Sequence, residues 1–207
     1  MVNPARLVSS MLAAQGEEAM VRYGEMVPIA ADRVKPVYEG DVLGLGKGQL
    51  LRFLDAPGHA PHELCIHESR NQGVFTGDAA GLYVADEVLL PITPPPSFNT
   101  ELYVDTLERL MALEPVAIYF AHFGVSNTAQ ESLKSVRDKL LVWDDMVAEA
   151  IKENKFDGVM EKIKDQTCAE LEPVRKMEPL YKYLTGFFVP LNIAGYSKYY
   201  QEKYEAR

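Results

Sequence analysis

Cysteine is scarce in this chain, with two residues among 207, Cys65 and Cys168. They lie too far apart in the sequence to match a zinc-binding or disulfide pattern, and each is interpreted as a small buried apolar residue. The chain also lacks any run of about 18 apolar residues, the length that a membrane-spanning helix needs. Residues 1–6 show no basic region followed by a long apolar stretch, which a secretory signal would have. From these absences we expect a cytoplasmic protein that has no membrane partner.

Basic residues are the minority charge. Lysine and arginine number 21 against 30 aspartates and glutamates, so the formal net charge is -9. No block of like charge stands out, and this balance argues against a nucleic-acid partner. Apolar residues make up 47% and charged residues 25% of the chain, which is typical of a soluble globular protein. The length suits one domain with a sizeable core.

The first part of the chain is predicted to form a helix followed by short strands. Apolar residues near a 3.6-residue period predict a helix over residues 5–24. Between residues 27 and 78, short β-type runs alternate with turn residues, and Gly46–Gly48 and Ser69–Gly73 are predicted to be hairpin connections. The predicted strands are Val42–Leu45, Gln49–Leu54, Glu63–His67 and Val74–Thr76.

The second part is predicted to be mainly helical. Pro91–Pro96 can continue neither a helix nor a central strand and must be a loop, after which Ser97 or Asn99 can cap a helix. The apolar run Val116–Phe120 predicts a strand buried on both faces. Apolar residues at spacings of three and four then predict a long helix, and shorter helices follow. The stripe of the long helix is Leu133, Val136, Leu140, Trp143, Val147 and Ala150, and the prolines expected to break the later helices are Pro173, Pro179 and Pro190.

Three polar residues each follow a predicted strand, and their types suit a metal centre. His59 comes after Asp55–Gly58, where a proline and a glycine force a turn, and a neutral imidazole there can bind Zn, Fe or Mn. Asp78 follows Thr76-Gly77, and a carboxylate in this position can bridge two metal ions with its two oxygens. His122 follows Val116–Phe120. Together they predict a metal site along one edge of a sheet.

Each of these residues also has an ordinary structural interpretation. A single histidine is more often a hydrogen-bonded structural residue than a metal ligand, and a single aspartate after a strand is as often a turn or cap residue. The three together favour the metal site, because the structural interpretation must then hold three times. His62 is interpreted as a ligand, a supporting partner or a solvated loop residue, and His67 as a strand residue facing solvent.

The motifs Pro57-Gly58-His59, Thr76-Gly77-Asp78 and Ala121-His122 together resemble the metallo-β-lactamase superfamily of binuclear metallohydrolases. The resemblance covers at least residues 34–128. It implies an α+β fold, the αββα sandwich of that family, with metal ligands His59, Asp78 and His122. Asp78 is expected to bridge the two ions, Zn or Fe/Mn, and to take part in catalysis. The implied reaction is hydrolysis of an ester, thioester, lactone or amide by a metal-bound hydroxide.

The sequence departs from the family in one respect. The family's leading motif, His-x-His-x-Asp-His, occurs nowhere in it. The resemblance therefore implies the second part of the sandwich, with a partial metallo-β-lactamase-like domain over residues 1–128 and a C-terminal helical extension over residues 129–207 packed on it. Each metal ion would keep two of four protein ligands, whereas zinc sites normally have three or four.

Two functions from different classes follow. The first is a metal-dependent hydrolase of a small-molecule substrate, incomplete in this chain alone. The second is a non-catalytic remnant or subunit that folds and forms a homo-oligomer without binding a full dinuclear centre. Half of a sandwich would expose an apolar sheet face, and such faces drive association.

Overall fold

The computed structural model describes residues 2–17, 21, 24–84, 88–122, 124–153 and 155–205. The chain divides into two compact units, Met1–Val37 and Tyr38–Arg207. The first contains helix α1 (Ala5–Gln15) and a short 3-10 turn η1 (Ala31–Arg33). The predicted helix over residues 5–24 is interrupted after Gln15, because Gly16 takes a positive φ of 73° and ends α1, whereas Val21 is again helical. Residues 18–20, 22 and 23 of that prediction lie outside the described residues.

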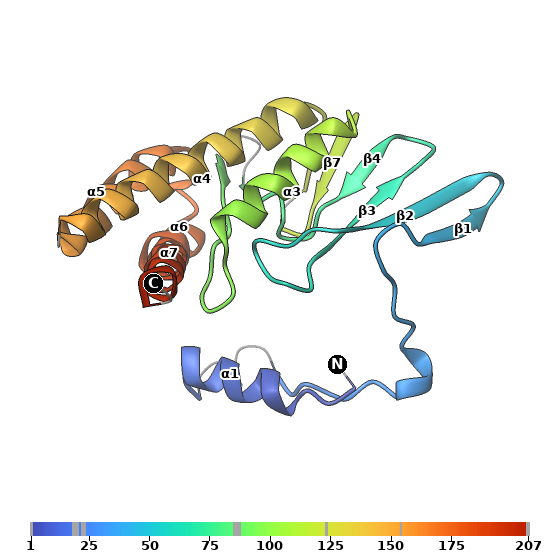
Figure 1. Cartoon of the computed structure of the whole chain (residues 1–207), viewed down its shortest axis with the longest axis horizontal. Coiled ribbons are helices and arrows are strands. Elements are labelled where there is room, and N and C mark those ends of the chain that lie inside the picture. Colours follow the sequence, from blue (N-terminus) through green and yellow to red (C-terminus); the bar gives the residue numbers. More distant parts are fainter. Residues whose placement is uncertain are drawn as a thin grey trace. The chain divides into compact units, whose positions relative to one another are not determined.

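The second unit is built on a mixed six-stranded sheet in the order β1-β2-β3-β4-β7-β8, shown in Figure 1. All neighbouring strands are antiparallel except β4 and β7, which run parallel. A separate pair, β5 and β6, forms a two-stranded sheet. The strands are β1 (Val42–Gly46), β2 (Gln49–Asp55), β3 (Leu64–Glu68), β4 (Gly73–Phe75), β5 (Leu82–Val84), β6 (Val88–Leu90), β7 (Ala117–Phe120) and β8 (Gly124–Ser126).

Helices account for most of the rest of this unit, and the fold is α+β. The expected caps are present in part, since the Asn99 side chain accepts a hydrogen bond from the Leu102 amide at the start of α3. Pro179 and Pro190 lie in the first turns of α6 and α7, where a proline is tolerated, rather than breaking them. The elements are α3 (Thr100–Ala112), α4 (Ala129–Lys152), α5 (Phe156–Glu170), η2 (Glu172–Val174), α6 (Glu178–Tyr183), the π-helical turn η3 (Leu184–Phe188) and α7 (Val189–Glu205).

One face of the six-stranded sheet is well covered over its central strands, although Val42 and Leu50 at the β1–β2 edge of the same face are 55% and 45% exposed. Figure 1 shows α3 and α4 running along one side of it. Side chains alternate along a strand, so the register brings Leu54, Cys65, Val74 and Ile118 to a common face, where they are at most 6% exposed. The predicted stripe of α4 is also buried throughout. Burial raises the pKa of the Cys65 thiol to about 12, which agrees with an inert core residue.

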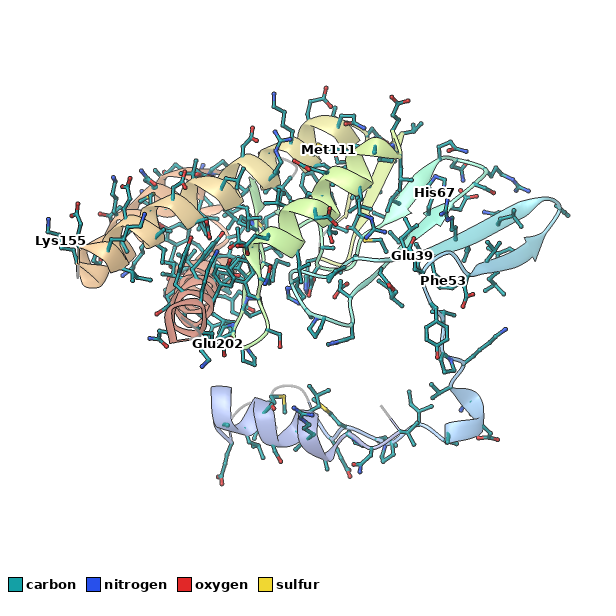
Figure 2. All side chains as sticks on the ribbon, viewed as in Figure 1. Glu39, Phe53, His67, Met111, Lys155 and Glu202 are labelled. Carbon is teal, nitrogen blue, oxygen red and sulfur yellow. The ribbon has the colours of Figure 1, made fainter. Side chains whose placement is uncertain are left out.

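The other face of the sheet is partly open. Leu43 and Phe75 are each 45% exposed, and Val125 is 38% exposed. The rings of Phe75 and Tyr119 stack there with centroids 4.6 Å apart. Phe53 belongs to this open face, whereas His67 lies on the opposite one, and Figure 2 labels both on their neighbouring strands. Apolar side chains therefore line both faces of the sheet.

Two single-residue predictions are wrong. Val116 is 61% exposed and lies one residue before β7, where its amide donates to the carbonyl of Gln72, the residue before β4. His67 faces the covered side, is half-buried, and its buried Nε2 has no hydrogen-bond partner. Within the described part of the chain, every helix is too short or too polar to cross a membrane.

Candidate metal centre

His59 is positioned by a turn that packs against the start of α3. Gly58 has a φ of 130°, and a Cβ there would overlap the backbone of Tyr103, so only glycine fits. The turn is held from both sides, since the Asn99 amide donates to the Gly58 carbonyl over 2.9 Å and the Thr106 hydroxyl donates to the Pro57 carbonyl over 2.6 Å. The His59 side chain is 13% exposed as a result.

The imidazole of His59 is also oriented. Its Nδ1 lies 2.9 Å from the carbonyl oxygen of Ile92. A carbonyl oxygen only accepts, so Nδ1 carries the proton and donates, and Nε2 keeps its lone pair. A hydrogen bond of this kind fixes the tautomer of a metal-binding histidine. Nε2 lies 3.5 Å from Oδ2 of Asp78.

Asp78 and His122 meet because β4 and β7 are parallel. Both residues follow the carboxyl ends of their strands, which lie at the same edge of the sheet. The Ala121 amide bonds to the Gly77 carbonyl and ties the two strand ends together. His122 Nε2 lies 3.3 Å from Oδ1 of Asp78, so the two imidazoles contact different oxygens of one carboxylate. The His122 side chain is 51% exposed.

Neighbouring groups hold Asp78 by its backbone. The Tyr103 hydroxyl donates to the Asp78 carbonyl over 2.9 Å, and the Asp78 amide donates to Oε1 of Glu63 over 3.3 Å. Burial raises the pKa of the Glu63 carboxyl, and the nearby His59 opposes that shift. Oδ1 of Asp78 is buried without a hydrogen-bond partner, although His122 lies beside it. A buried carboxylate oxygen in this state is suited to a cation.

The structure thus brings together the three residues predicted from sequence and leaves His62 exposed and apart from them in the turn before β3. Glu63 and the carbonyl of Ile92 were not predicted. Glu63 offered only the signal of an acidic residue between the turn and β3. A backbone carbonyl offers none, because any residue at position 92 would supply it.

The three residues fit a metal centre in type but are few. Two imidazole nitrogens flanking the two oxygens of one carboxylate are ligands that Zn, Fe and Mn accept. Among the described residues, however, no group of three or more His, Cys, Asp or Glu side chains is arranged to hold a metal ion. His59, Asp78 and His122 therefore form the beginning of a ligand set, and a zinc ion would require further ligands.

Comparison with known proteins decides the ancestry. The sequence pattern of the metallo-beta-lactamase superfamily matches residues 6–122, a segment that contains His59, Asp78 and His122. The chain belongs to the metallo-beta-lactamase superfamily. Members of this superfamily bind divalent metal ions, zinc or iron.

Individual superfamily members agree with this assignment. The chain is 34% identical over 110 residues to the metallo-beta-lactamase fold-containing protein ST1585 of Sulfurisphaera tokodaii, an alignment that covers 52% of the chain and 40% of ST1585. The crystal structure of the archaeal superfamily protein ST1585 from Sulfolobus tokodaii superimposes with a TM-score of 0.58 at 28% identity, over 66% of the chain and 51% of that structure. The chain therefore spans about half or less of these relatives.

A second structure supports the fold alone. The metallo-beta-lactamase family protein TTHA1429 from Thermus thermophilus superimposes with a TM-score of 0.54 at 17% identity, covering 97% of the chain and 60% of that structure. The superposition includes the C-terminal helices, so the α+β architecture predicted from the superfamily resemblance is confirmed.

Proposed function

We propose that this chain supplies His59, Asp78 and His122 to the metal centre of a hydrolase that acts on an ester, thioester, lactone or amide. One observation carries the proposal: the Nε2 atoms of the two histidines lie 3.5 and 3.3 Å from the two oxygens of Asp78, and one of those oxygens is buried without a hydrogen bond. When bound, divalent ions supply a water of lowered pKa and a positive charge for the developing oxyanion.

The chain's own residues prepare the site for that chemistry. The Ile92 carbonyl holds His59 in the tautomer that presents Nε2. Tyr103 and Glu63 form hydrogen bonds with the backbone of Asp78, so its carboxylate oxygens stay available to bind metal ions. The larger exposure of His122 opens the site toward solvent, the direction from which a water and a substrate must enter.

Zinc binding tests the proposal without requiring turnover. Calorimetric titration with Zn²⁺ is compared between the native chain, Asp78→Ala, and the control Asp105→Ala, an exposed aspartate on α3. We expect Asp78→Ala to lower affinity by more than about 100-fold, because even the loss of a group that merely supports a ligand costs 10- to 100-fold. Asp105→Ala should bind as the native chain does. Equal binding by Asp78→Ala and the native chain would overturn the assignment.

A second candidate function is a non-catalytic subunit that forms a homo-oligomer. The open face of the sheet favours it, since Leu43 and Phe75 are each 45% exposed. Tyr119, which stacks on Phe75, pairs across β7 and β8 with Val125, which is 38% exposed. An exposed apolar face of this kind promotes association. The metal centre favours this second function as well, because among the described residues no group of three or more His, Cys, Asp or Glu side chains is arranged to hold a metal ion.

Oligomeric state tests the second candidate. Light scattering after size-exclusion chromatography should give a multiple of the chain mass for the native protein and a lower mass for Phe75→Lys. Leu141→Lys is the control, because Leu141 is a similarly exposed leucine, 40%, on α4. A monomeric native chain, or an unchanged mass for Phe75→Lys, would exclude this role for the open face. A zinc-binding monomer that hydrolyses simple thioesters would leave the hydrolase as the function.

A further inference from the structure

A cavity of about 310 Å³ extends from the candidate metal centre toward the C-terminal helices. One part of the lining is His59, Asp78 and His122, with Ile92 beside them, since its carbonyl contacts His59. The remaining part, called the far end below, consists of side chains of α6, η3 and α7, together with Leu82 and Pro94. The loop before α3 was predicted from its prolines, and its residues Ile92 and Pro94 both line this cavity.

The far end of the cavity is apolar. Leu180, Leu184, Phe188 and Leu191 contribute to it from the helical side. Among the described residues that line the cavity, no lysine, arginine or glutamate occurs, and the aspartate is Asp78. A wall of this composition does not stabilise a charged group. Phosphates, nucleotides and dicarboxylates are therefore poor occupants of this end.

Asn192, one of the polar residues in the wall, uses its side-chain amide in hydrogen bonds within the protein. Its Oδ1 accepts from the amide of Thr93, and its Nδ2 donates to the Phe188 carbonyl over 2.7 Å. The Thr93 hydroxyl donates to the Asn192 carbonyl over 2.9 Å. These bonds attach the loop containing Ile92 and Pro94 to α7. Asn192 therefore fixes the shape of the cavity and has little capacity to bind a polar ligand.

The helical wall is locally irregular where it meets the cavity. Leu184 and Phe188 are the first and last residues of the π-helical turn η3. Such turns are wider than α-helical ones and frequently occur at functional sites. Together with the loop held by Asn192, η3 gives the cavity a defined boundary on two sides.

We infer that the cavity binds the apolar acyl group of a neutral ester or thioester, with the carbonyl group at the end formed by His59, Asp78 and His122. This inference rests on the proposed function for the position of the carbonyl. A molecule of liquid water occupies about 30 Å³, so the cavity accommodates roughly ten atoms of that size. The acyl chain is accordingly of medium length, and each methylene that enters the apolar end leaves water.

Binding of neutral primary amides tests the inference without a metal ion. Calorimetric or saturation-transfer measurements compare acetamide, butanamide, hexanamide and octanamide with the native chain. We expect affinity to rise about fourfold for each methylene that is buried. Leu191→Gln, at a half-buried position of the wall, should remove this dependence on chain length, and Leu180→Gln is a second half-buried variant in case the first does not fold. Leu141→Gln, on the exposed side of α4, is the control and should retain it.

The outcomes separate this inference from the proposed function. Asp78→Ala should still bind octanamide, because the apolar wall is intact in that variant, while losing zinc. A native chain whose affinity is independent of amide length overturns the inference, whatever its zinc binding. Persistence of the length dependence in folded Leu191→Gln and Leu180→Gln overturns it as well. Unchanged zinc binding by Asp78→Ala, with the amide series behaving as expected, would instead reject the metal centre and leave the apolar cavity established.

Discussion

The two faces of the six-stranded sheet differ in how completely they are packed over its central strands, β3, β4 and β7. On the face toward α3 and α4, Cys65, Val74 and Ile118 are at most 1% exposed. On the other, Phe75 directly follows Val74 in the same strand and is 45% exposed. Adjacent residues of one strand thus have opposite environments, although both are apolar. The covered face supports the folding of the unit and positions the candidate site, whereas the open face has the composition of a contact surface.

The tightest packing, between α7 and the loop at Thr93, gives the largest expected effect. A Cβ at Gly195 of α7 would overlap the Thr93 carbonyl oxygen, whereas a Cβ at Gly186 meets nothing within 4 Å. We expect Gly195→Ala to lower the free energy of unfolding by about 4 kcal/mol or more, through overpacking against backbone that cannot move aside. Gly186→Ala, in the same helical run, should not destabilise. Urea unfolding measures both, and equal stability of the two variants would show that α7 is loosely attached.

A matched pair of truncations compares the two faces directly. Ile118→Ala removes a fully buried side chain from the covered face and should cost about 2–5 kcal/mol. Phe75→Ala, on the open face, should cost less, because Phe75 is 45% exposed and its stack with Tyr119 adds only about 0.5–1.5 kcal/mol to the contribution of the buried area. The measurement is again urea unfolding, at low protein concentration. A larger loss for Phe75→Ala would indicate that the open face is covered in solution.

Loosening the attachment of the cavity wall should have an intermediate effect on the free energy of unfolding. Asn192→Ala leaves the buried Thr93 amide without its acceptor and the Phe188 carbonyl without one donor. The expected loss in the free energy of unfolding is about 1–3 kcal/mol, the penalty of an unsatisfied buried polar group. Because Ile92 belongs to the same loop, the variant should also shift the NMR signals of the His59 ring. Native stability together with unchanged His59 NMR signals would show that the loop does not support the candidate site.

The smallest effect concerns pH. Burial raises the pKa of Asp144 above its ordinary 3.8, although the Thr100 and Tyr200 hydroxyls donate to its carboxylate. The folded state therefore holds this proton more tightly than the unfolded chain does. The resulting stability is fully present below pH 3.8 and is lost as pH rises through the folded pKa. Asp144→Asn cannot lose a proton, so its melting temperature relative to the native chain should rise as the pH increases from 3.8 upward. A difference in melting temperature between the two proteins that does not change with pH would contradict a raised pKa of Asp144.

Local pattern was sufficient to predict the central part of the fold. Strands β1 to β4 lie within two residues of their predicted positions, because turn residues separate short runs of β-type residues. Strands β5, β6 and β8 were missed, since three residues each are too few to display a period. Strand β4 is equally short and was predicted because the turn residues Ser69–Gly73 precede it. The end of α1 was missed because Gly16 stops a helix whose apolar spacing continues beyond it.

The candidate site was predictable in its side chains and not in its surroundings. His59, Asp78 and His122 each follow a strand, so their meeting at one sheet edge follows from topology. The apolar wall could not be predicted, because it depends on how η3 and α7, more than sixty residues further along the chain than His122, pack against the loop at Ile92. Metal identity and the remaining ligands are likewise outside what these three residues encode.

The π-helical turn η3 gives the wall of the cavity a tolerance for a change in chain length. A π-helical turn is closed by hydrogen bonds between residues i and i+5, so it holds one residue more than an α-helical turn, in which each residue advances by about 100°. Deleting one residue within Leu184–Phe188 would therefore return this segment to regular α-helical geometry and leave Leu191, Asn192 and Gly195 close to the surfaces on which they now lie. The same deletion within Val189–Leu191 has no wide turn to absorb it and would rotate Asn192 and Gly195 by about that angle. A change of one residue at η3 would thus alter the width of the cavity at Leu184 and Phe188 without redirecting α7.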